Sequence, residues 1–160
     1  MIWVRSISRS APLRKHSDTD QKPYFAGFMD AKANFAINMI RYKTRRYTQI
    51  EAVVIVYGNN TRPLKLVQEF YGGTISIADR REAGGKAVYR LQIKYKQDVV
   101  NMIKDILPYL KIKRKNAELL LRYCESRLKS MEEGRFARIT DEERRIAKEL
   151  VALNKQVPQD

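Results

Sequence analysis

Side chains that commonly act as nucleophiles or general bases are scarce in this chain of 160 residues. Its only histidine is His16 and its only cysteine is Cys124. A Ser–His or Cys–His nucleophile would depend on His16, which stands in a polar leader, so we do not expect one. Cys124 falls in an apolar helical stretch and is expected to be a buried structural thiol, with no disulfide and no multi-cysteine zinc site. Chemistry here would have to come from carboxylates, lysines and a bound metal ion.

A carboxylate and a lysine stand close together in one apolar segment. Residues 24–33 read YFAGFMDAKA, with Asp30 and Lys32 near the end. The segment fits a helix with Asp20 as its N-cap and Pro23 in its first turn. On that helix Asp30 and Lys32 lie about 200° apart, so their side chains point in nearly opposite directions. Metal-assisted hydrolysis of a phosphodiester needs ligands that hold a divalent ion, and a protonated lysine repels it.

Strand and helix patterns follow this segment. Phe35, Ile37 and Met39 alternate with more polar residues, which indicates a strand with one buried face. Thr140 and Glu143 have the spacing of a capping box, which predicts the start of a final helix. We expect an α+β domain with the core order α-β-β-α-β-β-α-α, with four antiparallel strands and helices on one face, and the final helix follows this core. The expected elements are helices over 21–31, 62–70, 97–107 and 113–131, a helix from Thr140, and strands over 34–40, 49–57, 74–78 and 87–95.

The chain is strongly basic, with a formal charge of +14. The surplus is distributed, with +3 over residues 1–19, +7 over residues 20–110 and +4 over residues 111–160. A surplus in the folded part favours a polyanionic partner, with nucleic acid ahead of a membrane surface. A solvated basic surface is the alternative. No apolar run approaches the roughly 20 residues that span a bilayer, so we expect a soluble protein without a membrane partner.

The leader differs in composition from the rest of the chain. Its first 17 residues contain four basic residues, four serines and no acidic residue. This composition is typical of a mitochondrial presequence, and a helix over these residues would place four apolar side chains on one stripe: Ile2, Trp3, Val4 and Ile7. A basic arm that lies along a phosphate backbone is the alternative. We expect a mitochondrial protein with a basic extension over residues 1–20, a main domain over 21–132 and a helical extension over 133–160.

Residues 25–33 resemble the nine-residue motif that names the LAGLIDADG homing endonucleases. The resemblance extends to the element order, to the turn over residues 70–73, and to residues 106–113, whose Pro-Tyr-Leu-x-x-Lys pattern is similar to a signature of members with one motif per chain. It covers residues 23–125. It implies an α-β-β-α-β-β-α core in which a four-stranded antiparallel saddle sheet curves over a nucleic-acid duplex, followed by C-terminal helices.

The resemblance also implies where metal-dependent cleavage would occur, and the residues there depart from the pattern. The eighth motif position should be an acidic residue that holds a divalent metal ion, but it is Lys32, and Ala33 replaces the glycine behind it. Asp30 is two positions too early to replace the missing ligand. Lys113 matches a supporting lysine, and Asn59 or Asn60 falls near a polar residue that organises water. We expect a degenerate site with no metal and no cofactor, in which Lys32 contacts a phosphate or points to solvent. Mg²⁺ would be needed only by an active endonuclease.

The motif helix implies a second contact. By resemblance it packs on the same helix of a second copy, and its small residues Ala26, Gly27 and Ala31 would allow close approach. Gly27 costs a helix about 1 kcal/mol relative to alanine, which indicates a packing reason. Close packing inside one chain is the alternative to a homodimer.

Polar and basic side chains gather on the outward face of the predicted sheet and in its turns. Asn, Gln and Arg can bond to base edges, while lysines and turn arginines suit phosphates. Ile40, Val53 and Ile55 fall on the same face and are unusually apolar for groove reading. The candidate nucleic-acid-binding residues are Asn34, Asn38, Tyr42, Lys43, Arg45, Arg46, Gln49, Arg80, Arg90, Gln92, Lys94 and Lys113.

These observations favour a homing-endonuclease-derived protein that binds nucleic acid and has lost cleavage. RNA is favoured over duplex DNA, with a structural place in an organellar ribonucleoprotein such as the mitochondrial ribosome, alone or beside protein neighbours. The alternatives are a homodimeric site-specific DNA endonuclease, an intron-splicing maturase and a DNA-binding repressor.

Overall fold

The computed structural model describes residues 21–41, 43–44, 48–79, 87–134 and 138–156. The described residues form the predicted α+β order, with one short 3-10 helix that the sequence did not indicate. No helix among them is both long and apolar enough to cross a membrane. The elements are α1 (Gln21–Lys32), β1 (Ala33–Arg41), β2 (Thr48–Gly58), α2 (Thr61–Tyr71), β3 (Thr74–Asp79), β4 (Val88–Ile93), α3 (Lys96–Ile106), η1 (Leu107–Tyr109), α4 (Arg114–Glu133) and α5 (Asp141–Lys155).

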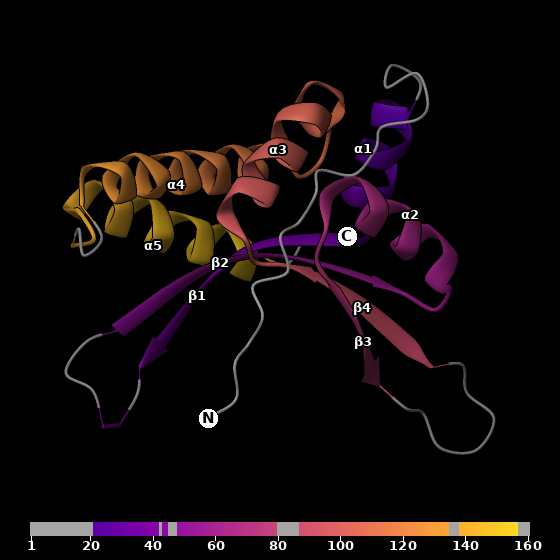
Figure 1. The fold of residues 1–160 in the computed structure, drawn as a ribbon, viewed down its shortest axis with the longest axis horizontal. Coiled ribbons are helices and arrows are strands. Elements are labelled where there is room, and N and C mark those ends of the chain that lie inside the picture. Colours follow the sequence, from indigo (N-terminus) through magenta and orange to yellow (C-terminus); the bar gives the residue numbers. More distant parts are fainter. Residues whose placement is uncertain (1–20, 42, 45–47, 80–86, 135–137, 157–160) are drawn as a thin grey trace.

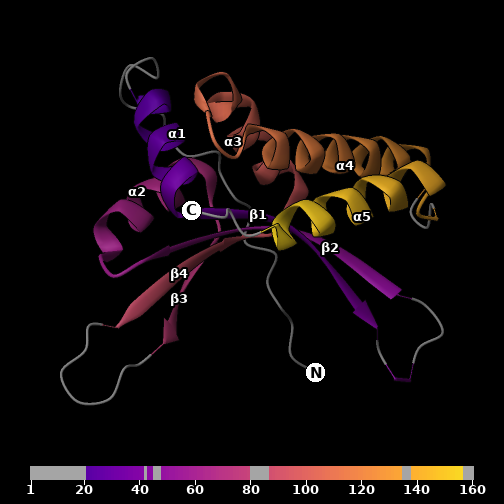
Figure 2. The same ribbon diagram turned by 180° about the vertical axis from the view of Figure 1, so that it is seen from behind.

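The four strands form one antiparallel sheet in the order β1-β2-β4-β3. Figure 1 shows the helices on one side of an arched sheet, and the β1–β2 and β3–β4 hairpins spreading apart on the other side. The view from behind in Figure 2 shows the same two layers. No helix of the described segments covers the other face of the sheet, which is the outer face discussed below (Figure 1).

The helix-covered face of the sheet is apolar because side chains alternate along each strand. Phe35 and Ile37 of β1 are buried, as the alternation predicted, and so are Leu91 and Ile93 of β4. Toward the hairpin end the pattern weakens, since Met39 is 41% exposed. Together with the buried faces of all five α-helices these side chains form a single core.

Local signals set the boundaries of α2. The Asn60 side chain accepts a hydrogen bond from the Arg62 N–H at 3.0 Å and caps the first turn. At the other end, the Gly72 N–H donates to the Gln68 carbonyl, and Gly73 has a φ of +100°. A Cβ at Gly73 would lie 2.7 Å from the Gln92 carbonyl oxygen, so only glycine permits β3 to start this close to β4.

The last helix is joined to α4 by a buried carboxylate. Glu143 is completely buried, and it forms the predicted capping box with Thr140. Its oxygens also accept from the Ser126 hydroxyl at 2.7 Å and from the Arg127 guanidinium at 3.2 Å. Cys124, on the same helix as these two partners, is buried as expected, and burial raises its pKa to about 12.

The free edge of β1 is also covered. Asn154 of α5 donates to the Phe35 carbonyl at 2.9 Å, and the Lys113 ammonium donates to the Ala33 carbonyl. Both carbonyls belong to the strand at the edge of the sheet, where unpaired backbone groups would otherwise invite another chain. The helices after residue 113 therefore pack on the sheet as part of one body.

Candidate nucleic-acid interface

Asp30 is the only carboxylate in α1, and both of its oxygens accept hydrogen bonds. They accept hydrogen bonds from the backbone N–H groups of Lys111 at 2.8 Å, Ile112 at 3.1 Å and Lys113 at 2.9 Å. Burial raises the pKa of Asp30, but these N–H donors and the Lys113 charge outweigh it, so the pKa is lowered overall. Asp30 thus holds the segment that leads into α4, a role that no pattern in the sequence indicated.

Lys113 matches a lysine expected at the cleavage site, but its ammonium donates to the Ala33 carbonyl at the edge of β1. Burial lowers its pKa, and the nearby Asp30 charge opposes that shift. The hydrogen bond directs Lys113 toward the sheet edge rather than onto the outer face. It also ties the start of α4 to the residue that follows Lys32.

Lys32 is the last residue of α1, and its side chain is exposed. The nearest carboxylate in the motif, Asp30, already has its lone pairs on three N–H groups, while Lys32 itself brings a positive charge. Within the described ranges there is no cluster of three or more histidine, cysteine, aspartate or glutamate side chains that could hold a metal. The residues at the end of α1 therefore do not fit a divalent cation.

The small residues of α1 divide between the inside and the outside of the chain. Ala26 is completely buried in the chain's own core, whereas Gly27 and Ala31 are exposed. A Cβ at Gly27 would meet no atom within 4 Å. Close packing against the described residues therefore does not explain Gly27, and the exposed pair Gly27 and Ala31 remains a predicted contact surface.

Side chains on the outer face form rows that run across the strands. Asn34 of β1 is opposite Ile55 of β2, which is opposite Gln92 of β4, and Gln92 is opposite Thr74 of β3. This first row crosses all four strands. Because paired residues in an antiparallel sheet point to the same side, these side chains lie next to one another.

A second row contains Tyr57, Arg90 and Ser76, in register on β2, β4 and β3. The Arg90 guanidinium donates to the Ser76 hydroxyl at 3.1 Å, which orients it along the sheet. Tyr57 is 40% exposed, and the sequence reasoning did not include it among the candidates. Its position on β2, two residues after Ile55, is the signal that could have found it.

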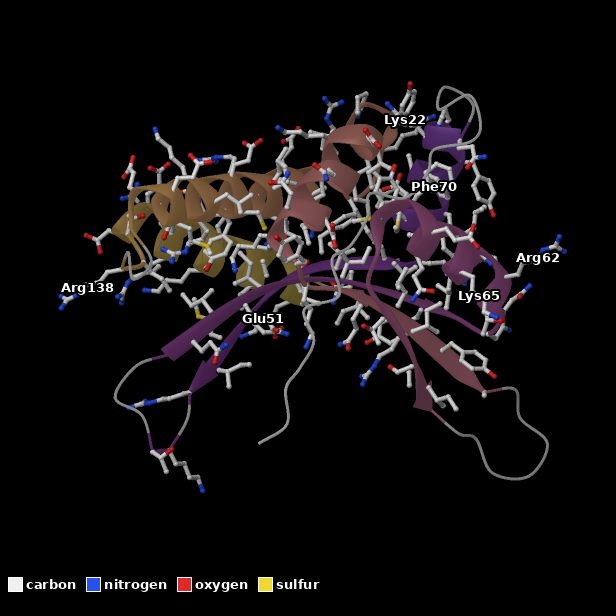
Figure 3. The ribbon with its side chains drawn as sticks, viewed as in Figure 1. Lys22, Glu51, Arg62, Lys65, Phe70 and Arg138 are labelled. Carbon is white, nitrogen blue, oxygen red and sulfur yellow. The ribbon has the colours of Figure 1, made fainter. Side chains whose placement is uncertain are left out.

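Two of the predicted residues, Lys94 and Asn38, have the acidic residue Glu51 as a neighbour. Lys94 lies 3.4 Å from the Glu51 carboxylate, and Figure 3 shows Glu51 on the side of the sheet away from the helices. Glu51 is opposite Asn38, which is exposed. Two apolar residues, Val53 and Ile55, lie on the outer face between the polar positions. Val53 is completely buried and Ile55 is half-buried, so this part of the face exposes little side-chain surface.

The remaining candidates lie in or near the hairpin turns. Gln49 and Lys43 are exposed toward the β1–β2 turn. Together with Asn34, Asn38, Arg90, Gln92 and Lys94 they occupy the outer face and its rim. Four predicted residues lie outside the part of the chain that the structure describes: Tyr42, Arg45, Arg46 and Arg80.

A small cavity adjoins the first row. It has a volume of about 260 Å³ and lies between the start of β3, the end of β4 and the start of α3. Tyr95, which is 64% exposed, and Asp98 line it, and neither was a candidate from the sequence. The expected strand over residues 87–95 would place Tyr95 on the same face as Leu91 and Ile93, but β4 ends at Ile93 and Tyr95 is the N-cap of α3. The lining residues are Gly73, Thr74, Gln92, Lys94, Tyr95 and Asp98.

The fold is similar to solved structures of homing endonucleases. The homing endonuclease I-CvuI bound to the I-CreI target is 20% identical to this chain, with a TM-score of 0.65 over 89% of this chain and 87% of that one. The archaeal intron-encoded homing endonuclease I-Vdi141I, complexed with DNA, is 15% identical, with a TM-score of 0.67 over 90% and 91%. The LAGLIDADG homing endonuclease I-GzeII in complex with its DNA target is 14% identical, with a TM-score of 0.57 over 84% of this chain and 44% of that one. No protein-family model and no curated protein matches the chain.

Proposed function

We propose that this chain, which has the fold of the LAGLIDADG homing endonucleases, binds nucleic acid through the outer face of its sheet and does not cleave it. The observation that carries the proposal is the set of rows on that face. Arg90, Gln92 and Asn34 place hydrogen-bond donors and acceptors side by side, and no helix of the described chain covers them. Such side chains bond to base edges and phosphates.

The end of α1 supports binding without cleavage. Two-metal hydrolysis needs anionic ligands with free lone pairs beside the scissile phosphate. Both oxygens of Asp30 accept hydrogen bonds from the N–H groups that precede α4, and the Lys113 ammonium donates to the Ala33 carbonyl. Lys32 supplies an exposed ammonium instead. A cation at this point attracts a phosphate and contributes electrostatic affinity without chemistry.

RNA is the favoured partner. A protein that has lost cleavage gains nothing from a site in duplex DNA, whereas a structured RNA gives a basic surface a lasting structural role. The basic extension over residues 1–20 fits an organelle as the place of action, and a ribonucleoprotein such as the mitochondrial ribosome as the assembly. These features support a structural component rather than an enzyme.

A homodimeric DNA endonuclease is the runner-up, and one observation favours it. Gly27 and Ala31 are exposed on α1, and none of the residues that the structure describes packs against Gly27 in a way that requires it to be small. A second copy could bring another backbone close at this surface. The related I-CvuI complexes were obtained in the presence of Mg and Ca, so Mg²⁺ is the ion on which this function would depend.

Competition binding separates these functions. In the first experiment the purified chain is titrated into a labelled structured RNA, with unlabelled duplex DNA as competitor. In the second, the duplex DNA is labelled and the structured RNA is the competitor. We expect RNA binding that weakens steeply with salt, because phosphate contacts release counterions. The double variant Arg90→Ala/Lys94→Ala should bind weakly, whereas the matched double variant Lys104→Ala/Arg122→Ala on the helical side should bind like the unaltered chain. A tight complex with duplex DNA that structured RNA cannot displace would contradict the RNA assignment.

A further inference from the structure

The cavity beside the first row combines groups that suit one unpaired base. We propose that it binds a single unstacked base of an RNA strand, with the ring of Tyr95 as the stacking platform. The inference rests on the proposed function and names the ligand of one part of that surface. It adds Tyr95, which the sequence did not predict as a contact, to the interface.

The position of the cavity connects it to the nucleic-acid face. Thr74 and Gln92 belong to the first row and also line the cavity. An RNA strand bound along the first row would therefore pass the opening of the cavity. Tyr95 immediately precedes α3, and its backbone is held because the Val99 N–H donates to the Tyr95 carbonyl at 3.0 Å. An exposed aromatic ring on a fixed backbone is a suitable platform for stacking a base.

The size of the cavity favours one base over a larger ligand. Its volume of about 260 Å³ is just below the range of roughly 300–1,000 Å³ that drug-sized ligands occupy. Gly73, which lines the cavity, cannot carry a side chain without meeting the Gln92 carbonyl, so β3 and β4 lie close together beside it. A base pair inside a duplex cannot enter it, since its two faces are covered by neighbouring pairs.

The polar groups around the cavity match the remaining parts of a nucleotide. The Gln92 amide both donates and accepts, so it can pair with the edge of a base. Lys94, 51% exposed at its side chain, lies 3.4 Å from Glu51 in a pair that solvent screens, so a phosphate can compete for the ammonium. An aromatic ring, an amide and a cation around one small cavity are the recurring elements of single-strand recognition.

The test compares a hairpin RNA that carries the fluorescent base 2-aminopurine in its loop with a fully paired RNA duplex. Variants Tyr95→Ala and Tyr95→Phe are measured with both probes by fluorescence anisotropy and by 2-aminopurine quenching. The control Tyr109→Ala removes another exposed tyrosine, 44% exposed, from η1 and away from the sheet. Thermal unfolding of each variant verifies that the fold is kept.

We expect Tyr95→Ala to weaken binding to the hairpin loop roughly 5- to 100-fold, the effect of one lost base–aromatic stack, and to abolish quenching. Tyr95→Phe should keep both affinity and quenching, and affinity for the paired duplex should not change in any variant. Equal losses for the loop and the duplex, or no loss in Tyr95→Ala, would overturn the inference while leaving RNA binding in place. If the unaltered chain binds neither probe, the proposed function itself fails, and the inference fails with it.

Discussion

Two carboxylates hold helices in place at two distant points of the molecule, Glu143 at the start of α5 and Asp30 at the end of α1. Each accepts hydrogen bonds from three residues, and for each the donors lower the pKa against the effect of burial. Glu143 is completely buried and has a cationic partner, Arg127. Asp30 is only half-buried, its hydrogen bonds come from backbone N–H groups, and the Lys113 charge lowers its pKa without an ion-pair contact among those described. A lowered pKa therefore does not mark a metal ligand here, because in both cases the lone pairs already have donors.

Replacement of Glu143 should have the largest effect on stability. Glu143→Gln keeps the shape but removes a charge that Arg127 and Ser126 contact at 3.2 and 2.7 Å. We expect a loss of about 1.5–3 kcal/mol in the free energy of unfolding, typical of hydrogen bonds to a charged group. Urea unfolding measures it, with Glu142→Gln as the exposed neighbouring control. A loss as small as that of the control would show that the buried network contributes nothing.

Replacement of Asp30 should lower the free energy of unfolding by less than replacement of Glu143. Asp30→Asn retains an acceptor oxygen for the N–H groups that precede α4 but removes the charge, so we expect a loss of about 1 kcal/mol, as for a weakened helix cap. RNA affinity should not fall, because Asp30 faces backbone groups and not the outer face. A clear change in affinity at unchanged stability would mean that Asp30 takes part in binding, and the contrast with Glu143 would then be lost.

The two carboxylates should also make stability fall in acid. Both have folded-state pKa values below their ordinary values, so the stability they contribute is fully present above about pH 4.5 and is lost as the pH falls through the folded-state values. Urea unfolding from pH 7 to pH 3 should show this decline. The double variant Asp30→Asn/Glu143→Gln should show a shallower one. An equally steep decline in the double variant would assign acid sensitivity to other groups.

Lys32 should have the smallest effect, and on affinity alone. Lys32→Ala removes one exposed cation, so we expect RNA affinity to fall a few-fold and the salt dependence to decrease by about one phosphate contact. Stability should stay within about 0.5 kcal/mol, as for most surface substitutions. Lys43→Ala, at an exposed candidate phosphate contact on the sheet rim, is the comparison variant and should lower affinity by a similar amount. If Lys32→Ala changes nothing in either measurement, its ammonium points to solvent only.

The two caps also show what the sequence could and could not predict. The Glu143 cap was predictable because its partner Thr140 is three residues away, within one local pattern. The hydrogen bonds of Asp30 were not predictable, because the N–H groups that donate to it are more than eighty residues further along the chain. Only the packing of α1 against η1 brings Asp30 and these N–H groups together. The strand alternation was predictable for the same local reason, since one face of each strand had to be apolar.

The candidate site was predictable only in part. The outward positions Asn34, Arg90 and Gln92 follow from the strand period, and the structure places them on the outer face. Lys113 was grouped with them by resemblance, and the structure instead bonds it to the Ala33 carbonyl. Tyr95 was missed because the cavity that it lines is formed by three elements, and no local pattern reports how such elements meet.

The central claim is that the outer face binds nucleic acid while the end of α1 cannot support cleavage. One experiment tests both parts, in which the chain is incubated with labelled structured RNA and with supercoiled plasmid DNA in the presence of Mg²⁺ or Mn²⁺. Each sample is divided between a native gel and a denaturing gel. We predict a salt-sensitive shift of the RNA in the native gel, with every strand recovered intact in the denaturing gel. Nicked plasmid that accumulates with time and only with the metal would contradict the account.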